Sequence, residues 1–504
     1  MPKILDKLSL IALILFGSAA QASPDAVGVG LRQQLRGLEA ALADAGNAQL
    51  SNRALLQRAG LMAADAAPAA VTPIRAGPGP DPEAQVEIEM MDARLALGML
   101  AQAFGEADND IVLAARATRR PGALVVRQGV ANLADLRLFL DLYGMPALAG
   151  PRGTLDLRVP LLVMPDAALA LAPGQGLRLS RTHGAFLVNM GTLRVAGAEI
   201  SVTGPAAPAS PAFVPFVATA GGGAVEVTAA RVSGLGFGQT AKFSGFSVLG
   251  NGLAARPRAS VIRGSRISDI VSLSVAGVAG IVVEDNRFRR MRGRALVLSA
   301  ATGARVRGNI FHDGVPNNAI RVTDGSARGI VEDNVVLGGS RSGIVVDASS
   351  HATTIRGNTV WRRDGGGIKV DRADCALIGR NTVIDNRQKG IEVRTSQGTR
   401  VTGNRAIANS SAGLWVSAQD AGTLTYLVGN VVAANGAGMA TASAGRMYLA
   451  GNDFSNQFPR FLHGDVARQS ALIARDLKGL EPMLITGAGG QAAARPPSPC
   501  TDAG

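Results

Sequence analysis

Eight asparagines recur at nearly regular intervals through the second half of the chain, and this repeat limits the possible fold more than any other feature. They are spaced by 22 to 26 residues and stand in phrases such as Val306-Arg307-Gly308-Asn309-Ile310-Phe311. A repeat of this length, rich in Val and Ile and punctuated by Gly, is typical of one coil of a solenoid. Because the segments between the Gly residues have the pattern of strands, the sequence predicts an all-β parallel β-helix. We expect the asparagines to have a structural role in the turns, and they are Asn286, Asn309, Asn334, Asn358, Asn381, Asn404, Asn430 and Asn452.

A second strand in each repeat can be aligned from coil to coil. Its alternate positions are almost always aliphatic, so these side chains point into the coil and the others point outward. Coils stack about 4.8 Å apart, so the outward side chains form one continuous face. Such a face suits an extended polar polymer, and a sheet that is merely solvated is the alternative. The outward side chains form two columns, Val297, Arg321, Val345, Lys369, Glu392 and Trp415 in the first and Ser299, Thr323, Asp347, Asp371, Arg394 and Ser417 in the second.

Residues 1–22 have the pattern of a secretory signal peptide. Lys3 and Lys7 provide a basic start, Leu8 to Phe16 is an apolar stretch, and Ala20-Gln21-Ala22 is a small-residue cleavage site. The apolar stretch is too short to span a bilayer, and no later stretch is long enough. The sequence therefore predicts a periplasmic protein without a membrane span that begins near Ser23. An uncleaved anchor is the alternative.

The net charge indicates which partners the chain attracts. The formal charge is +13, and it becomes +12 when the signal peptide, with its two Lys and one Asp, is removed. A strong positive charge favours polyanions, and outside the cytoplasm an acidic polysaccharide is the expected one. No basic run is interleaved with aromatic residues, so we expect no nucleic acid partner. A GC-rich genome, which favours Arg and Ala, is the other interpretation of the charge.

Residues that commonly bind metals are sparse. The four His are far apart, no C-x-x-C pair is present, and the glycine-rich calcium-binding nonapeptide of some β-helices is absent. We therefore expect no metal and no other cofactor. The two cysteines, Cys375 and Cys500, would meet an oxidising compartment, but a single pair leaves open whether they form a disulfide.

The chain divides into six segments. Residues 1–22 are the signal peptide, and residues 23–66 are expected to be helical because leucines recur at helical spacing between Leu31 and Leu42. The remaining segments are a Pro/Gly-rich linker at 67–86, a mixed lead-in and cap segment at 87–122, the β-helix at 123–463, and a short helix with a disordered tail at 464–504.

The helical segments before and after the coils are interpreted as caps, because the strand edges at the ends of a solenoid must be covered. Docking of the N-terminal helices onto a partner is the alternative. The Pro- and Ala-rich segment Gly204–Thr219 is expected to be a loop between coils that walls a binding groove.

The segment Leu177–Gly191, with the sequence LRLSRTHGAFLVNMG, resembles the start of the β-helix in the periplasmic mannuronan C5-epimerases of alginate secretion. Further matches are Pro215-Phe216, Leu235-Gly236-Phe237 and the Gly-Ile-x-Val coils, including Ser342–Asp347. The resemblance covers roughly residues 120–460. It implies a right-handed parallel β-helix in the periplasm that acts on a polyuronate during export, with proteins of an envelope export complex as further partners.

The sequence departs from this family at its catalytic motif. The family has D-P-H-D on the outward strand, with the His as a catalytic base. By strand register this motif falls on Val297-Leu298-Ser299-Ala300, which retains none of the four residues. The family's Arg that helps to neutralise the sugar carboxylate falls near Thr323-Asp324, with Arg321 close by. Epimerisation needs a group that stabilises the developing negative charge, a base and an acid on the opposite face, so the family's catalytic residues are not carried over.

The same face offers a rearranged set of residues. Lys369, Asp371 and Glu392 are the candidate catalytic residues, a cation beside two carboxylates, and ion pairs between coils are the structural alternative. Trp415 is a candidate for stacking on a sugar ring, or it is an ordinary surface aromatic. The other candidate substrate-binding residues are Arg321, Asp347 and Arg394.

Three functions stay open. The first is a polysaccharide C5-epimerase or lyase with a rearranged site. The second is a non-catalytic protein that binds an anionic exopolysaccharide or scaffolds its export. The third is an unrelated use of the fold, such as surface adhesion. A base beside Arg321 or Lys369 would favour the first function, a groove lined with cations but without a positioned base the second, and a flat face the third.

Overall fold

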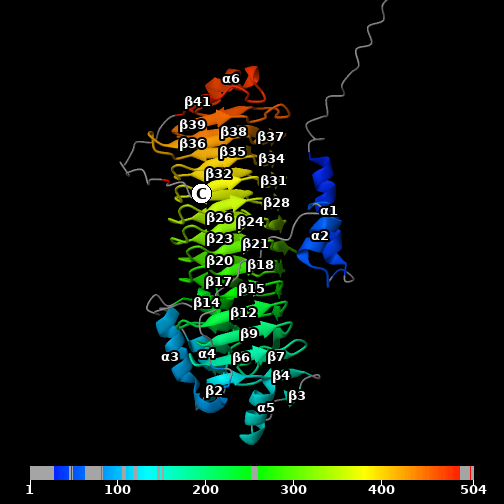
Figure 1. Cartoon of the computed structure of the whole chain (residues 1–504), viewed down its shortest axis with the longest axis vertical. Coiled ribbons are helices and arrows are strands. Elements are labelled where there is room, and N and C mark those ends of the chain that lie inside the picture. The colour runs from blue at the N-terminus through cyan, green and yellow to red at the C-terminus, as the bar shows by residue number, and fades with distance from the viewer. Residues whose placement is uncertain are drawn as a thin grey trace, which may run out of the picture.

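The computed structural model describes residues 28–44, 47, 49–62, 81, 83–104, 109–116, 122–144, 148–149, 153–250, 259–487 and 500. The predicted signal peptide, most of the predicted linker and most of the predicted tail lie outside these residues. The described chain winds into a tall column of parallel coils (Figure 1), which confirms the predicted all-β parallel β-helix. Among the described residues, no helix is long and apolar enough to cross a membrane.

Successive coils contribute strands to three parallel sheets, which we name A, B and C. Sheet A contains β2 (Gly122–Ala131), β5 (Leu161–Val163), β8 (Leu187–Asn189), β11 (Val217–Thr219), β14 (Gly245–Leu249), β17 (Ser272–Ala276), β20 (Leu296–Ser299), β23 (Ile320–Thr323), β26 (Ile344–Asp347), β29 (Ile368–Asp371), β32 (Ile391–Arg394), β35 (Ala412–Ser417), β38 (Ala437–Ala442) and β40 (Leu462–Gly464). The strand β1 (Glu87–Asp92) pairs antiparallel with β2.

Sheet B starts at the end of β2, because this long strand continues from one sheet into the next. It contains β6 (Ala167–Leu171), β9 (Thr192–Ala196), β12 (Ala224–Thr228), β15 (Val261–Arg263), β18 (Val282–Glu284), β21 (Arg305–Arg307), β24 (Ile330–Glu332), β27 (Thr354–Arg356), β30 (Leu377–Gly379), β33 (Arg400–Thr402), β36 (Leu424–Val428) and β39 (Arg446–Ala450), with β41 (Met483–Thr486) antiparallel at its end.

Sheet C is separate from the other two. It contains β3 (Leu148–Ala149), which is antiparallel, and then β4 (Thr154–Leu157), β7 (Gly176–Ser180), β10 (Glu199–Thr203), β13 (Arg231–Ser233), β16 (Arg266–Ser268), β19 (Arg287–Arg289), β22 (Ile310–His312), β25 (Val335–Leu337), β28 (Thr359–Trp361), β31 (Thr382–Ile384), β34 (Arg405–Ile407) and β37 (Val431–Ala433).

The asparagine ladder lies in the turn between sheets B and C and is buried throughout. The Asn358 side chain donates a 2.9 Å hydrogen bond to Oδ1 of Asn381 and another of 2.9 Å to the carbonyl of Val331. Each rung thus binds the next rung and the backbone, which confirms the structural role. A second, shorter ladder of Asn386, Asn409, Asn435 and Gln457 lies in the turn between sheets C and A, and the sequence analysis missed it.

The helices α1 (Val29–Ala43) and α2 (Asn52–Arg58) do not cap the solenoid, which corrects the prediction from sequence. They pack against the outer face of sheet C, beside the column in Figure 1. This packing is possible because the outward side chains of sheet C are apolar here, and the contact buries Leu35, Leu38, Leu55 and Leu56 against Ile310, Val335, Leu337, Trp361, Ile384 and Ile407. Burial of these apolar side chains holds the pair of helices, which we call the α1–α2 hairpin, against the flank of the column.

Other elements cover the two ends. The helix α5 (Leu133–Leu142) follows β2 and buries Leu136 and Leu140 against the first coils. At the opposite end lie the 3₁₀ turn η4 (Ala467–Gln469), α6 (Ser470–Arg475) and β41, with Ile473 and Ile485 in the same core (Figure 1). The open strand edges are thereby protected from pairing with another chain.

Cys375 and Cys500 form a disulfide, which answers the question that the sequence left open.

The first coils of sheet A are covered on their outer face. The helices α3 (Ala93–Phe104) and α4 (Asp110–Ala114), the 3₁₀ turn η3 (Ala241–Phe243) and the loop before β11 bury an aromatic cluster of Phe186, Phe213, Phe216 and Phe243 there, with Phe237 partly buried beside it. The outward side chains of sheet A are apolar in these covered coils, where they are Val125, Leu162, Val188 and Ala218. In the next two coils they are the serines Ser247 and Ser274. Sheet A is therefore open to solvent only from about β17 onward.

Candidate functional site

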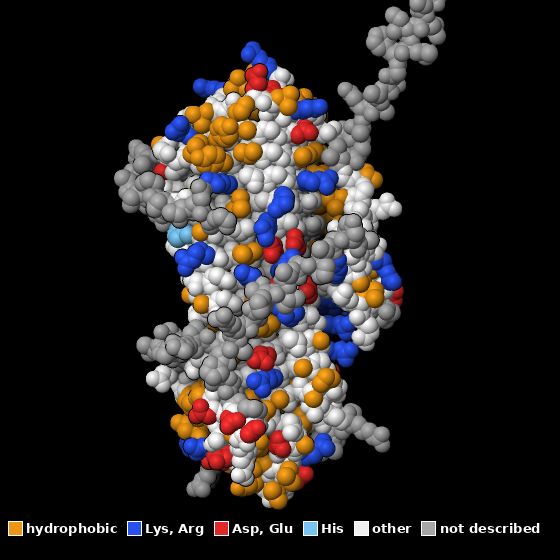
Figure 2. Space-filling view, in the orientation of Figure 1, with side chains coloured by type: hydrophobic (Ala, Val, Ile, Leu, Met, Phe, Trp, Pro, Cys, Tyr) orange, Lys and Arg blue, Asp and Glu red, His pale blue; other side chains and the backbone are white. Residues whose placement is uncertain are grey.

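The open part of sheet A presents the two columns that the sequence predicted. Arg321 pairs in register with Val345, Val345 with Lys369, Lys369 with Glu392, and Glu392 with Trp415. In the second column Asp347, Asp371 and Arg394 lie on successive strands. The structure thus places all seven predicted site residues on one face. Basic and acidic side chains also lie beside one another elsewhere on the column, as the view in Figure 2 shows.

The predicted catalytic residues form short-range ion pairs rather than one cluster. The Lys369 ammonium lies 3.3 Å from the Asp371 carboxylate on the same strand. Glu392 instead accepts a 3.0 Å hydrogen bond from Lys389, whose ammonium also lies 4.4 Å from the centre of the Trp415 ring. Each carboxylate therefore already has a cation beside it, and Trp415 is engaged with Lys389. This geometry favours a structural role for these residues, although each pair joins near neighbours in the chain rather than residues on adjacent coils.

A hollow of about 340 Å³ lies at the end of this face that is next to η3. It has the size of a small ligand site, and its floor is formed by β17, β20 and β23. The hollow is lined by Gln239, Ala241, Ser272, Ser274, Val275, Ala276, Arg294, Val297, Ser299, Arg321, Thr323 and Asp324. Val297 and Ser299 are the positions at which the epimerase motif would stand. The structure therefore places a cavity where the resemblance placed a catalytic site.

The two arginines that line the hollow, Arg294 and Arg321, lie beside the carboxylate of Asp347 on the next coil. The Arg321 guanidinium donates a 2.8 Å hydrogen bond from Nη2 to Asp347. Burial lowers the pKa of Arg294, as does repulsion by Arg321, while Asp347 raises it. Within the described part of the chain, Arg294 Nε, Arg321 Nε and Asp347 Oδ1 are buried and lack a hydrogen-bond partner. Together with Asp324, which also lines the hollow, these groups are formally neutral, but the two guanidinium groups keep N–H donors that suit an anionic group such as a sugar carboxylate.

Arg294 was not found from sequence, because it stands two residues before β20 and outside the strand columns. The residues Gln239, Ser272 and Ser274 were missed for a similar reason. The segment before η3 has no repeat pattern, and the outward column was followed only from Val297 onward. A continuation of that column by one coil toward the N-terminus would have reached Ser274.

The one carboxylate that lines the hollow is Asp324, directly after β23. Its Oδ2 accepts a 2.9 Å hydrogen bond from the Ser299 hydroxyl. The residues that line the hollow include no His, Lys, Tyr or Cys. Proton removal and return from opposite faces of a sugar ring need two positioned groups. The hollow therefore offers cations that can hold a carboxylate and a single candidate base.

Comparison with known proteins adds three similarities. The family described as Periplasmic copper-binding protein (NosD) matches residues 258–461. The chain is 26% identical over 286 residues to a mannuronan C5-epimerase of Pseudomonas putida, a match that covers 52% of this chain and 53% of that protein. It is also similar in fold to the crystal structure of the periplasmic alginate epimerase AlgG, with a TM-score of 0.56 and 19% identity over 76% of this chain and 93% of that one. For a mutant of AlgG the TM-score is 0.52, with 21% identity over 72% and 82% of the two chains.

The chain thus spans about half the length of the curated epimerase that it matches. The resemblance to the alginate epimerases is confirmed in sequence, and the likeness to AlgG confirms the fold. The similarity to a copper-binding family is not matched by a group of metal-binding side chains in the described residues. No three His, Cys, Asp or Glu side chains gather as metal ligands in the described residues, and Cys375 and Cys500 are joined in a disulfide. The described residues therefore do not fit a copper site of His and Cys ligands.

Proposed function

We propose that this chain is a periplasmic protein that binds an anionic, uronate-containing polysaccharide along the open face of sheet A without epimerising it. The observation that carries this proposal is the hollow at β17, β20 and β23, where Arg294 and Arg321 lie together while a base and acid pair is missing from the lining residues. The location follows the similarity to proteins called periplasmic. The class of polymer follows the similarity to alginate epimerases.

The N–H donors of the two arginines in the hollow fit one sugar carboxylate. Arg321 has five N–H donors, of which the bond to Asp347 uses one, and the planar guanidinium pairs well with a carboxylate through two parallel bonds. Arg294 adds a second, half-buried cation. Ser272, Ser274 and Ser299 supply hydroxyl groups of the kind that bind sugar hydroxyls. A bound uronate would therefore find both charge and hydrogen-bond partners on one surface.

The rest of the face supports a polymer rather than a single sugar. Lys369, Asp371, Glu392, Arg394 and Trp415 continue the two columns over the next coils, in register with Arg321 and Asp347. Polar side chains repeated at every coil give an extended chain a series of weak contacts. We assign these residues to polymer binding, with the ion pairs Lys369–Asp371 and Lys389–Glu392 fixing their positions.

Epimerase or lyase chemistry is the second candidate, and one observation favours it. Asp324 lines the same hollow as the two arginines and is fixed by Ser299. A carboxylate base beside a cation is sufficient for the first half of both reactions, which is removal of the C5 proton. The return of a proton for epimerisation, or the expulsion of the linked sugar for a lyase, would then have to rely on water.

Incubation of the protein with polymannuronate, followed by proton NMR and co-sedimentation, separates these functions. We expect the polymer to be retained by the protein and its spectrum to stay unchanged, while a neutral polysaccharide of similar length is not retained. New guluronate signals or solvent deuterium at C5 would establish an epimerase. Unsaturated end groups would establish a lyase. No retention at low salt would exclude a role in binding this polymer.

A further inference from the structure

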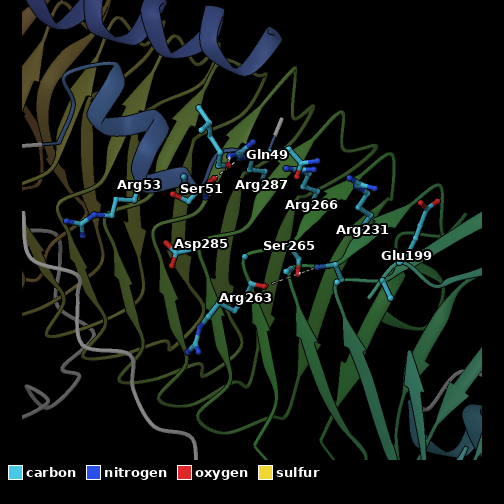
Figure 3. Close-up of a pocket in the computed structure, with 18 of the residues that line it drawn as sticks. Gln49, Ser51, Arg53, Glu199, Arg231, Arg263, Ser265, Arg266, Asp285 and Arg287 are labelled. Carbon is cyan, nitrogen blue, oxygen red and sulfur yellow. Dashed lines mark hydrogen bonds between the residues drawn. The ribbon is translucent and has the colours of Figure 1, made fainter. Parts of the chain in front are cut away.

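A second positively charged site lies on sheet C, away from the open face of sheet A. Arg231 of β13, Arg266 of β16 and Arg287 of β19 stand in register on three successive strands, with Glu199 of β10 at one end of the row. Figure 3 shows these side chains in one line. Neighbouring strands lie about 4.8 Å apart, so three like charges follow one another at nearly the shortest spacing that a sheet allows. Like charges directly opposite on neighbouring strands are destabilising.

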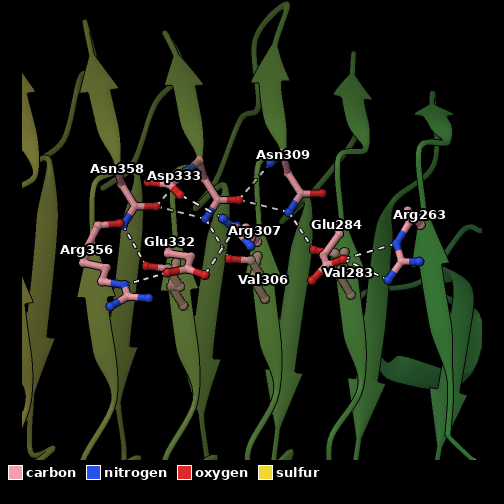
Figure 4. A network of polar contacts seen from close by, with 12 residues as sticks. Arg263, Val283, Glu284, Val306, Arg307, Asn309, Glu332, Asp333, Arg356 and Asn358 are labelled. Atoms are coloured by element: carbon pink, nitrogen blue, oxygen red, sulfur yellow. Dashed lines mark hydrogen bonds and ion pairs between the residues drawn. The ribbon is translucent and has the colours of Figure 1, made fainter. Parts of the chain in front are cut away.

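Sheet B shows how this solenoid usually arranges charges on successive coils. Its outward column alternates in sign through Arg263, Glu284, Arg307, Glu332 and Arg356 (Figure 4). Arg263 lies 3.0 Å from Glu284, and Arg356 lies 2.6 Å from Glu332. Each charge in this column is thus flanked by charges of the opposite sign, whereas three arginines follow one another in the row on sheet C.

The arginine row forms one wall of a cleft of about 660 Å³. The other wall is the segment Gln49–Arg53, which connects α1 to α2 and includes the start of α2. Five arginines line the cleft against two carboxylates, Glu199 and Asp285. The turns beside the row include Gly197 (φ 58°) and Gly264 (φ 61°), in a left-handed conformation that glycine adopts readily.

At one end of the row, Arg287 is hydrogen-bonded to the α1–α2 hairpin, whereas Arg231 and Arg266 are available to bind a ligand. Arg287 donates a 2.8 Å hydrogen bond to Oδ1 of Asn52 and another to the carbonyl of Leu50. Arg231 and Arg266 form no ion pair or side-chain hydrogen bond with any residue that the structure describes. Burial lowers the pKa of Arg287 to about 10, and Arg266 contributes to this shift. The pKa of Arg266 is lowered by burial and by Arg231. The fold thus holds these cations close together at a cost to its own stability.

We propose that the row Arg231, Arg266 and Arg287 is a second binding site, which takes the carboxylate groups of an acidic saccharide chain in the cleft under the α1–α2 hairpin. Guanidinium groups repeated in a straight line fit a linear ligand with regularly repeated carboxylates better than a compact anion. The volume of the cleft is within the range of ligand sites. The existence of the site follows from its geometry, and the choice of a saccharide ligand rests on the function proposed above.

Calorimetric titration of the full chain with a short oligomannuronate tests this site, because a short ligand cannot reach both faces at once. We expect two binding sites. Arg266→Ala should weaken the second at least tenfold and leave the first unchanged, while Arg321→Ala should do the reverse. Arg266→Glu should abolish the second site and raise the unfolding midpoint in the absence of ligand, because it gives the row the alternating signs of sheet B. Arg405→Ala, which removes an exposed arginine elsewhere on sheet C, is the matched control.

The outcomes separate this inference from the function proposed for sheet A. If one site is found and only Arg321→Ala weakens it, the sheet C site is excluded while the sheet A function stands. If Arg266→Glu weakens binding and Arg321→Ala does not, the sheet C site stands and the sheet A proposal is wrong. If inorganic phosphate binds the row and oligomannuronate does not, the saccharide assignment is overturned. Identical binding by the Arg266→Ala and Arg405→Ala proteins would also overturn it.

Discussion

The Arg321 guanidinium donates a 2.8 Å hydrogen bond to the carboxylate of Asp347 on the next coil of sheet A. Arg294 interacts electrostatically with both residues of this pair, since its pKa is lowered by Arg321 and raised by Asp347. Two cations thus share one carboxylate that is only 7% exposed. The loss of this carboxylate would leave the two guanidinium groups to repel each other. Both arginines keep N–H donors beyond those that Asp347 accepts, and we expect a bound sugar carboxylate to accept from them.

Replacement of Arg321 by Ala should therefore have two separable effects. Binding of polymannuronate should weaken by about tenfold or more, since a hydrogen bond between charged groups contributes about 1.5–3 kcal/mol. The unfolding free energy should fall by about 1–3 kcal/mol, because Asp347 loses its partner while it stays buried. Equilibrium binding and urea denaturation measure the two effects.

Arg321→Lys and Arg446→Ala serve as controls for this substitution. The lysine keeps the charge but not the planar fork, so we expect it to restore stability more fully than binding. Arg446 is an exposed arginine on sheet B, and its loss should change neither quantity. Equal weakening of binding in the Arg321→Ala and Arg446→Ala proteins would show that the polymer responds to net charge alone.

The fold was largely predictable because each coil repeats the same constraint. The ladder from Asn286 to Asn452 and the aliphatic columns fix both the period and the register. The placement of α1 and α2 was not predictable, because the contact depends on outward apolar residues of sheet C such as Trp361 and Ile384. In the sequence these residues are indistinguishable from ordinary strand positions, and nothing local indicates that a segment more than 300 residues away covers them.

The candidate site was predictable only in part. Strand register placed Arg321 and Asp347 on one face of neighbouring strands, where their side chains form a diagonal ion pair. The hollow itself depends on Arg294 and on the segment around Gln239, which stand in turns without a repeat pattern. The pairing of Lys369 with Asp371, rather than with Glu392, depends on side-chain conformations that no sequence pattern specifies.

A substitution in the asparagine ladder should destabilise the fold most when it lies in the middle of the ladder. Asn358, labelled in Figure 4, accepts hydrogen bonds from the backbone and side chain of Asn334. It donates to Asn381 and to the carbonyl of Val331. Asn358→Ala should lower the unfolding free energy by roughly 2–4 kcal/mol, because several buried groups lose their partners at once. Asn452 at the end of the ladder has an Asn neighbour on one side only, so Asn452→Ala should cost less. Urea denaturation of both proteins tests this order, and an equal loss would contradict a cooperative ladder.

The hairpin of α1 and α2 should depend on Asp385. Its carboxylate accepts hydrogen bonds from Arg32 of α1 at 2.8 Å and from the Trp361 indole at 3.0 Å. Asp385→Ala should speed hydrogen exchange in Val29–Ala43 by about tenfold, because loss of a partly buried, charged hydrogen bond of about 1.5 kcal/mol releases the helix locally. The exposed pair of Glu39 with Arg362 contributes little, so Glu39→Ala is the control. Equal exchange in the two variants would show that apolar packing alone holds α1.

Stability should fall as the pH drops below 6.5, and His312 should be one cause. Burial lowers the pKa of His312 below its usual 6.5, although Asp313 opposes this shift. The unfolded chain therefore binds a proton at a higher pH than the folded chain, and the unfolding free energy decreases with falling pH by at most about 1.4 kcal/mol per pH unit for this group. The decrease begins near pH 6.5 and ends below the pKa of the folded state.

His312→Gln should remove this part of the pH dependence, and urea denaturation at several pH values between 7.5 and 5 measures it. His183, whose pKa is also lowered by burial and by Arg158 and Arg116, should account for a further part that the variant retains. His463→Gln, a substitution at an exposed histidine, is the matched control. A slope that is the same with and without His312 would mean that its imidazole becomes protonated in the folded state as readily as in the unfolded chain. The Asp313 carboxylate, 3.3 Å from its Nδ1, would then fully offset the effect of burial.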